Sequence, residues 1–175
     1  MDKYLLICAL VIAVVGAAHD VREARIPNWL TYRGLIAAFA VRVVLLGWPG
    51  LRSGLVGMLV AGGVFYLLFL LGGMGGGDVK LMAVVAAWGG GAQAVPILIT
   101  AAIAGGILAV AYMTVGKRVR QTLLNTLELI RHHMLSGLRP HARLNVRQPS
   151  TTRVPYGVAI AMATLYCAGN AFWRR

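Results

Sequence analysis

Acidic side chains are rare in this sequence. Its 175 residues include 17 Lys and Arg but only five Asp and Glu. The five acids are Asp2, Asp20, Glu23, Asp78 and Glu128. Any chemistry that requires a carboxylate must therefore draw on these positions, and each of them can be examined individually.

Cysteine is scarce as well, and its placement argues against a metal site. Cys8 and Cys167 both lie within apolar runs, where we expect small buried side chains, and there is no CxxC pair. His132 and His133 are adjacent, so a helix would point them in different directions. We expect no metal and no other cofactor. A Walker A loop is excluded, because no Gly-Lys-Ser or Gly-Lys-Thr follows the glycines.

The hydrophobic content is too high for an ordinary soluble domain. Hydrophobic residues make up 59% of the chain, and the mean hydropathy is +0.75. Several segments approach or exceed the roughly 18 residues that a transmembrane helix needs. They are continuously apolar and do not alternate, which argues against a β-barrel. The sequence therefore predicts an all-α, polytopic integral membrane protein with a single domain over residues 1–175.

Six transmembrane helices are expected from the apolar segments and the turn residues between them. Pro27 is expected at the first turn of the second helix, where its missing N–H does no harm. The residues Gly-Trp-Pro-Gly at 47–50 predict a turn between the second and third. The fourth helix would be only about 16 Å long, which is short for a full crossing. The six segments cover about 4–18, 29–46, 51–71, 78–88, 94–115 and 154–172.

The net charge of +12 is concentrated in the connections between these segments. In a soluble protein this charge would suggest nucleic acid, but here it indicates the positive-inside bias and contact with anionic lipid headgroups. Eight of the Lys and Arg lie in 116–153, where apolar residues also recur at three- to four-residue spacing. We expect a basic amphipathic helix on the membrane surface. A loop helix packed on the protein is the alternative.

The charge distribution also predicts the orientation of the chain. With 116–153 in the cytoplasm, counting back places the 20–28 connection and the glycines at 72–77 on the same side. The turns near Trp48 and Gly90 then lie on the opposite side. Asp20 and Asp78 consequently lie on one face of the membrane, each at the end of a helix.

Asp78 follows a run of glycines that separates two strongly apolar segments. A carboxylate at membrane depth costs about 2.5–3.5 kcal/mol, and it therefore marks a functional site by default. Glycines lack Cβ atoms and allow another helix or an extended peptide to approach closely. The simpler alternative is an acid at a helix N-terminus, stabilised by the helix dipole.

Asp20 is the best available partner for Asp78, because the other acids lie at the far face or further into the loops. Two carboxylates that share a site cannot both ionise cheaply, so the pair holds a proton between them. One can then act as general base on a water while the other polarises the carbonyl as general acid. For Asp20 alone, a solvated helix end is the alternative.

Three segments resemble the prepilin peptidases, a family of membrane aspartic peptidases with a GxGD motif. Gly75-Gly76-Gly77-Asp78 with the following Val79-Lys80-Leu81 is similar to their GxGDxKL form. The segment 20–28, which ends in Ile-Pro-Asn, resembles the segment that carries their first aspartate. Pro155-Tyr156-Gly157 is similar to the opening of their last transmembrane helix. The resemblance covers nearly the whole chain in the right order.

The resemblance implies an inner-membrane endopeptidase that removes the leader of type IV prepilin-like proteins at the cytoplasmic face. Asp20 and Asp78 would be the catalytic pair. The prepilin would be its protein partner. Lys80 matches the motif, but the resemblance assigns it no role; an anchor to phosphate headgroups at the cytoplasmic end of the fourth helix is one interpretation. The motif residues that would shape the backbone or complete the three segments are Gly75, Gly77, Lys80, Pro27, Asn28, Pro155 and Gly157.

Longer members of the family carry an additional N-terminal region with zinc-binding cysteines, and some methylate the new N-terminus. This sequence begins directly at its first helix and lacks such cysteines. It therefore resembles the short, peptidase-only form found with tight-adherence (Flp-type) pilus systems. We expect no methyltransferase activity.

Two other classes of protein remain open on the sequence alone. Intramembrane acids and helices broken by glycine also occur in ion-coupled transporters. No inverted repeat is evident, however, and the acids lie toward one face. A non-enzymatic component of a secretion system would leave Asp20 and Asp78 unexplained. Cleavage of a substrate separates the peptidase from both.

Overall fold

The computed structural model describes residues 2–115, 128 and 155–173, and within these ranges the chain is helical apart from short connections and contains no strand. This confirms the predicted all-α architecture. The expected amphipathic helix at 116–153 lies outside the described residues, except for Glu128. The helices are α1 (Asp2–Glu23), α2 (Asn28–Gly57), the π-helix η1 (Met58–Gly62), α3 (Gly63–Leu70), α4 (Gly76–Gly89), α5 (Gly91–Val115) and α7 (Tyr156–Trp173).

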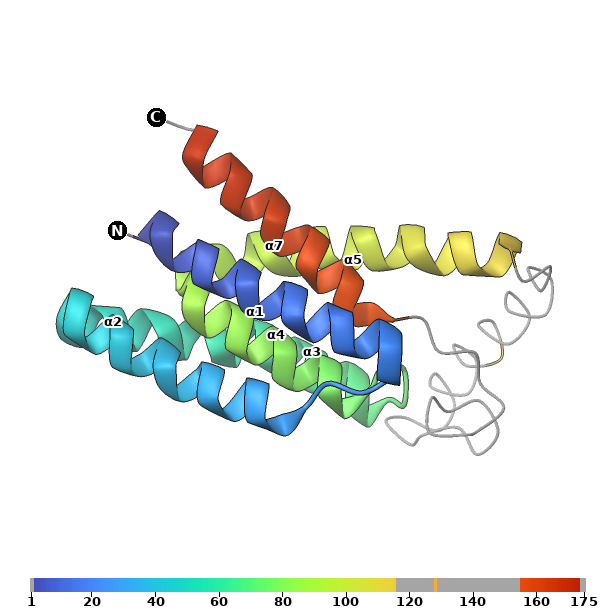
Figure 1. The fold of residues 1–175 in the computed structure, drawn as a ribbon, viewed down its shortest axis with the longest axis horizontal. Helices are drawn as coiled ribbons and strands as arrows, with labels where there is room; N and C mark the ends of the chain where they lie inside the picture. The colour runs from blue at the N-terminus through green and yellow to red at the C-terminus, as the bar shows by residue number, and fades with distance from the viewer. Residues whose placement is uncertain (1, 116–127, 129–154, 174–175) are drawn as a thin grey trace.

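Gly47 divides the longest helical stretch into two rods. Its φ of 62° and ψ of −152° are not helical, and the chain turns back on itself there (Figure 1). A positive φ suits glycine, which has no Cβ to clash. Pro49 falls in the first turn of the second rod, where no N–H is needed. The predicted turn at 47–50 is confirmed, and the second rod continues through η1 into α3.

Three stretches of the described chain are long and apolar enough to cross a membrane: Lys3–Glu23, Asn28–Leu70 and Gly91–Thr114. The second covers 43 residues and includes the reversal at Gly47, so it contributes two rods. With α1, α4, α5 and α7, the described chain has a rod at each of the six expected positions. Because α4 and α7 do not meet the same criteria of length and hydropathy, the six-span count stays a prediction.

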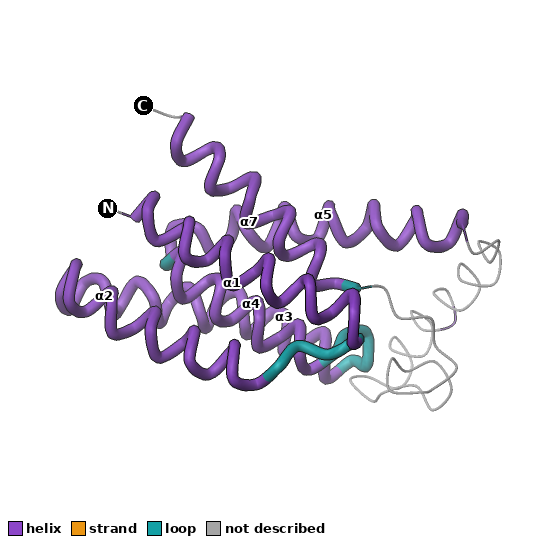
Figure 2. The backbone as a smooth tube through the Cα atoms, in the orientation of Figure 1, coloured by secondary structure: helices purple, strands orange, loops and turns teal. Residues whose placement is uncertain are grey.

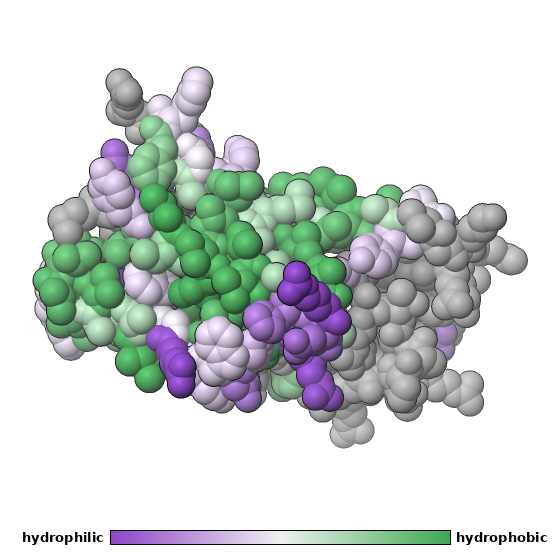
Figure 3. Space-filling model, viewed as in Figure 1, coloured by the Kyte–Doolittle hydropathy of each residue, from purple (hydrophilic) through white to green (hydrophobic). Residues whose placement is uncertain are grey.

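The outer faces of the rods carry large apolar side chains that nothing in the described chain covers. Val44 is 81% exposed, Ile36 69% and Leu59 65%. Figure 3 shows this wide apolar surface, interrupted by hydrophilic side chains over the end of α1 and the α1–α2 connection. Apolar area of this extent is abnormal in water and normal against lipid. Cys167 is buried as expected, but Cys8 is exposed on this outer surface, so that expectation was wrong for Cys8.

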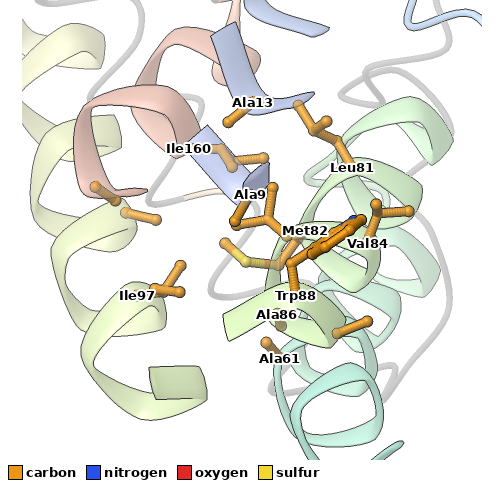
Figure 4. Packing of buried hydrophobic residues seen from close by; sticks show 14 of the residues in the cluster. Ala9, Ala13, Ala61, Leu81, Met82, Val84, Ala86, Trp88, Ile97 and Ile160 are labelled. Carbon is orange, nitrogen blue, oxygen red and sulfur yellow. The ribbon is translucent and has the colours of Figure 1, made fainter. Parts of the chain in front are cut away.

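The short helix α4 lies at the centre of the molecule and contacts every other described helix. Its side chains are buried from Leu81 to Trp88 with the exception of Ala83, which is partly buried. Figure 4 shows how Ala9, Ala13 and Ile160 from α1 and α7 pack on one side of it, with Ala61 on another. Small residues let the neighbouring backbones approach, which is how helices associate where no water drives them together.

Arg42 closes the end of the bundle where α4 finishes. It is 1% exposed, and its guanidinium donates hydrogen bonds to the Trp88 carbonyl at 2.8 Å and the Gly50 carbonyl at 3.4 Å. The last carbonyls of a helix have no partner within it and form the negative end of its dipole, so a cation is stabilised there. The predicted turns near Trp48 and Gly90 therefore meet at the same end of the molecule.

Candidate functional site

A cleft of about 940 Å³ opens at the end of the bundle opposite Arg42. Both predicted aspartates, Asp20 and Asp78, line it. The other walls come from the α1–α2 connection, the glycine loop before α4, the inner faces of α3 and α5, and the start of α7. In Figure 2 the two connecting loops lie at this end of the molecule. The structure thus brings together the two carboxylates that the sequence singled out.

Asp20 is held by the first turn of α7. α1 continues to Glu23, so Asp20 lies within its last turns and not beyond the helix end near residue 18 that the apolar run predicted. The Gly157 N–H donates a 2.8 Å hydrogen bond to Asp20 Oδ2. The N–H groups of a first helical turn have no partner within the helix, and they favour an anion. The start of α7 therefore fixes the position of one carboxylate oxygen.

Gly157 can donate this hydrogen bond only because it has no side chain. A Cβ at this position would lie 3.0 Å from Asp20 Oδ2 and 3.2 Å from the Ala17 Cα. The latter atom belongs to the backbone of α1, which cannot move aside cheaply. The role of Gly157 in the structure is thus close approach between α7 and α1.

Asp78 occupies the third position of α4, whose N-cap is Gly75. Its carboxylate reaches back over that N-cap, since a Cβ on Gly75 would lie 3.0 Å from Asp78 Oδ2. This is the position from which an acidic side chain serves the free N–H groups of a helix start. Asp78 therefore lies at the start of a helix whose remaining length is buried, with its carboxylate turned toward the cleft.

The α1–α2 connection lies against the first turn of α4. Gly77 makes this possible, because a Cβ there would meet Ile26 Cβ at 3.2 Å. Ile26 is 9% exposed, whereas Ala24 and Arg25 in the same connection are exposed and Pro27 is partly buried. Pro27 follows Ile26 in an extended conformation as the N-cap of α2, one position before the first helical turn in which the sequence placed it.

Lys80 has partners within the protein. Its Nζ donates a 2.9 Å hydrogen bond to Asn28 Oδ1 and lies 5.4 Å from the centre of the Tyr32 ring. Asn28 and Tyr32 are one turn apart at the start of α2. The sequence motifs that contain Lys80 and Asn28 are therefore in direct contact in the folded chain, although they are 52 positions apart.

Tyr156 lines the cleft and was absent from the predicted site residues, although it lies between two of them, Pro155 and Gly157. Its hydroxyl donates to the Ala101 carbonyl at 3.2 Å, and its ring packs edge-on against Phe65 at 5.7 Å. The hydroxyl also lies within electrostatic range of the Asp78 carboxylate. The only signal in the sequence was its place between Pro155 and Gly157, since none of these contacts is local.

The described residues contain no group of three or more His, Cys, Asp or Glu that could hold a metal ion. Within that part of the chain, the polar side chains that line the cleft are Asp20, Glu23, Arg25, Asn28, Asp78, Lys80, Tyr112 and Tyr156. The arrangement suits acid–base work by two carboxylates on a peptide that enters a partly apolar cleft.

These features define a class of protein: a helical membrane protein with a carboxylate-bearing cleft at one end of its bundle. Residues 5–110 match the type IV leader peptidase family, and the chain belongs to that family of membrane peptidases. The match includes both Asp20 and Asp78 and ends before α7. Comparison with curated proteins gave no match, and comparison with solved structures gave none either.

Proposed function

We propose that this protein is an aspartic endopeptidase that removes the leader peptide from type IV, Flp-like prepilins or pseudopilins at the cytoplasmic face of the inner membrane. Asp20 and Asp78 are its catalytic residues. The observation that carries this proposal is the cleft, which is lined by both carboxylates although they come from different helices. The family match supports peptidase activity, and the cleft supports the aspartic mechanism.

In the proposed reaction, a water molecule lies between the two carboxylates. The ionised carboxylate takes a proton from the water as it attacks the scissile carbonyl, and the protonated one donates to the developing oxyanion. The hydrogen bond from Gly157 keeps Asp20 in one orientation throughout. Well-oriented groups contribute strongly to catalysis, so a fixed carboxylate is an advantage here.

The proposed substrate enters the cleft from the lipid side. A prepilin leader is followed by a hydrophobic helix, which can remain in the bilayer while the junction between them unwinds beside Gly75 and Gly77. Phe69 on α3 and Ala109 on α5 provide apolar cleft walls on that side. The surface over the α1–α2 connection is hydrophilic (Figure 3), and we expect the hydrolytic water to enter from that side.

Cleavage of a co-expressed prepilin from the same genome tests the proposal directly. Leader removal is followed by gel shift and N-terminal sequencing for the wild type, Asp20→Asn and Asp78→Asn. Asp2→Asn is a matched control, because it makes the same substitution on α1 about 27 Å of helix away from Asp20. We expect cleavage by the wild type and the control, and a loss of at least 100-fold in both cleft variants, as for removal of a general acid or base.

The outcomes separate the classes of protein considered above. Normal cleavage by either cleft variant, when both are inserted in the membrane, would show that the two-aspartate mechanism is wrong. If the wild type cleaves none of the prepilins tried, the transporter and the non-enzymatic scaffold become the better-supported interpretations. Dependence of uptake on an ion gradient would then single out the transporter.

A further inference from the structure

The two carboxylates belong to separate helices, and something must hold the ends of those helices at a fixed spacing. We propose that Lys80 and Asn28 form a clamp that sets the spacing between Asp20 and Asp78, and that both are positioning residues for catalysis. This inference rests on the proposed function of the cleft. It gives a role to two motif residues that have none in the reaction itself.

The clamp joins the start of α4 to the start of α2, close in sequence to Asp78. Lys80 follows Asp78 by two residues on α4, and its Nζ donates to Asn28 Oδ1 at 2.9 Å. Asn28 is the first residue of α2, directly after the connection that begins at the end of α1. The hydrogen bond therefore ties the start of α4 to the connection that follows Asp20.

A second contact supports the same connection from its apolar side. Ile26 is packed against Gly77, the residue before Asp78, and Pro27 restricts the backbone between Ile26 and Asn28. The connection is thus held on the first turn of α4 by one apolar and one polar contact. If the polar contact is removed, the packing of Ile26 against Gly77 is left to hold the connection on the first turn of α4, while α1 keeps its own contacts with α4 and α7.

The surroundings of the Lys80 ammonium group indicate that it makes contacts within the protein and does not project freely into solvent. Lys80 is partly buried, and Tyr32 places its ring 5.4 Å from Nζ. A cation over an aromatic face is attracted by the negative charge on the face of the ring. The start of α2 thus offers both a carbonyl oxygen and a ring to the same ammonium, and two partners on one rigid helix fix its position better than one.

The clamp predicts effects on turnover and not on substrate binding. A shift of about 1 Å between catalytic groups costs up to 100-fold in rate, so a loosened spacing lowers kcat. For Lys80→Met and for Asn28→Leu we expect kcat to fall about tenfold with KM changed by less than about twofold. The double variant is expected to be no slower than the slower single variant, because both remove the same contact.

Conservative variants separate positioning from mere folding. Asn28→Asp keeps an oxygen acceptor at the same place and is expected to retain at least about half of the wild-type kcat, since Lys80 still donates to it. The kinetics use purified full-length protein in lipid nanodiscs and the prepilin that the wild type cleaves. Loss in Lys80→Met with normal turnover in Asn28→Leu would overturn the clamp and indicate that Lys80 acts alone, on substrate or lipid.

A spectroscopic distance gives a readout that does not depend on proteolysis. Spin labels at Val21→Cys and Gly73→Cys, both exposed, report the separation of the end of α1 from the loop before α4, in a background with Cys8→Ala and Cys167→Ala. We expect a broader distance distribution in Lys80→Met and in Asn28→Leu than in the parent protein. An unchanged distribution would overturn the clamp, whereas a wild type that cleaves no prepilin would overturn only the proposed function.

Discussion

At the scale of single residues, the cleft depends on glycines, because their missing side chains let neighbouring segments approach closely. Asp20 receives its hydrogen bond from the backbone of Gly157, and the two helices approach closely enough only without a side chain there. A carboxylate oriented by backbone is fixed more rigidly than one held by a long side chain. The same holds for Gly77, which admits Ile26.

Gly157→Ala is expected to reduce leader removal at least tenfold while the protein still inserts and folds. The added Cβ would lie 3.0 Å from Asp20 Oδ2 and 3.2 Å from the backbone of Ala17, so α7 must shift and the hydrogen bond to Asp20 lengthens. A shift of this kind costs one to two orders of magnitude in rate. Initial rates of cleavage per inserted enzyme measure the effect.

Gly169→Ala is the matched control on the same helix. No atom lies within 4 Å of a Cβ at Gly169, so the substitution leaves the packing of α7 unchanged. Equal rates for the two variants would contradict the argument that close approach at Gly157 orients Asp20.

The sequence predicted which residues line the cleft better than it predicted the contacts between them. Asp20 and Asp78 stood out because acids are rare, and the structure places both in one cleft. The donor to Asp20 is a backbone N–H that lies 137 positions away, and no side-chain pattern reports it. The contact between Lys80 and Asn28 has the same origin in tertiary packing.

At the scale of helices, α5 and α7 are joined at the cleft by one aromatic side chain. The Tyr156 ring lies directly over Gly105, and its hydroxyl donates to the Ala101 carbonyl at 3.2 Å. The neighbouring Gly106 faces open space. On α5, Gly105 therefore has no room for a side chain, whereas the adjacent Gly106 has.

Gly105→Ala is expected to destabilise the protein by about 1–3 kcal/mol, because the new methyl group overlaps the Tyr156 ring and forces α5 and α7 apart. Gly106→Ala is expected to be neutral or to stabilise, since alanine favours a helix by about 1 kcal/mol over glycine. Unfolding by SDS in mixed micelles measures both. Equal midpoints would show that Tyr156 moves aside without cost.

Hydropathy predicted the apolar rods but not their polar continuations. α1 runs on to Glu23 through polar residues, which gave no apolar signal beyond Ala18. Arg42 lies inside an apolar rod, and no neighbouring residue in the sequence predicts that its side chain is buried. Its partner, the Trp88 carbonyl, lies 46 positions further on. Such contacts depend on how the rods pack together, and the local composition of the sequence does not predict that packing.

At the scale of the whole molecule, the two ends of the bundle have different chemistry. One end holds the cleft, and the other holds Arg42 and the turns near Trp48 and Gly90. The excess of basic residues in the connections at the cleft end leads us to expect that end in the cytoplasm.

Labelling of single cysteines in intact cells tests this orientation, in a background with Cys8→Ala and Cys167→Ala. Trp48→Cys is expected to react with a membrane-impermeant maleimide, because Trp48 is 67% exposed at the end predicted to lie outside. Arg25→Cys is expected to react only after the cells are opened. The reverse pattern would place the cleft on the outer side of the membrane.

The short length of α4 has a consequence for which peptide bond is cut. Its 14 residues make a rod of about 21 Å, about 9 Å less than the hydrocarbon core of a bilayer. With the Arg42 end of α4 at one edge of the hydrocarbon, Asp78 stops below the opposite surface. Under the proposed function, α4 sets the depth of the site, so Asp20 and Asp78 are expected to meet whichever bond a membrane-held substrate presents at that depth. Selection by depth needs little recognition of the side chains around the bond, so one enzyme of this design can serve many substrates whose hydrophobic helices begin at the same level.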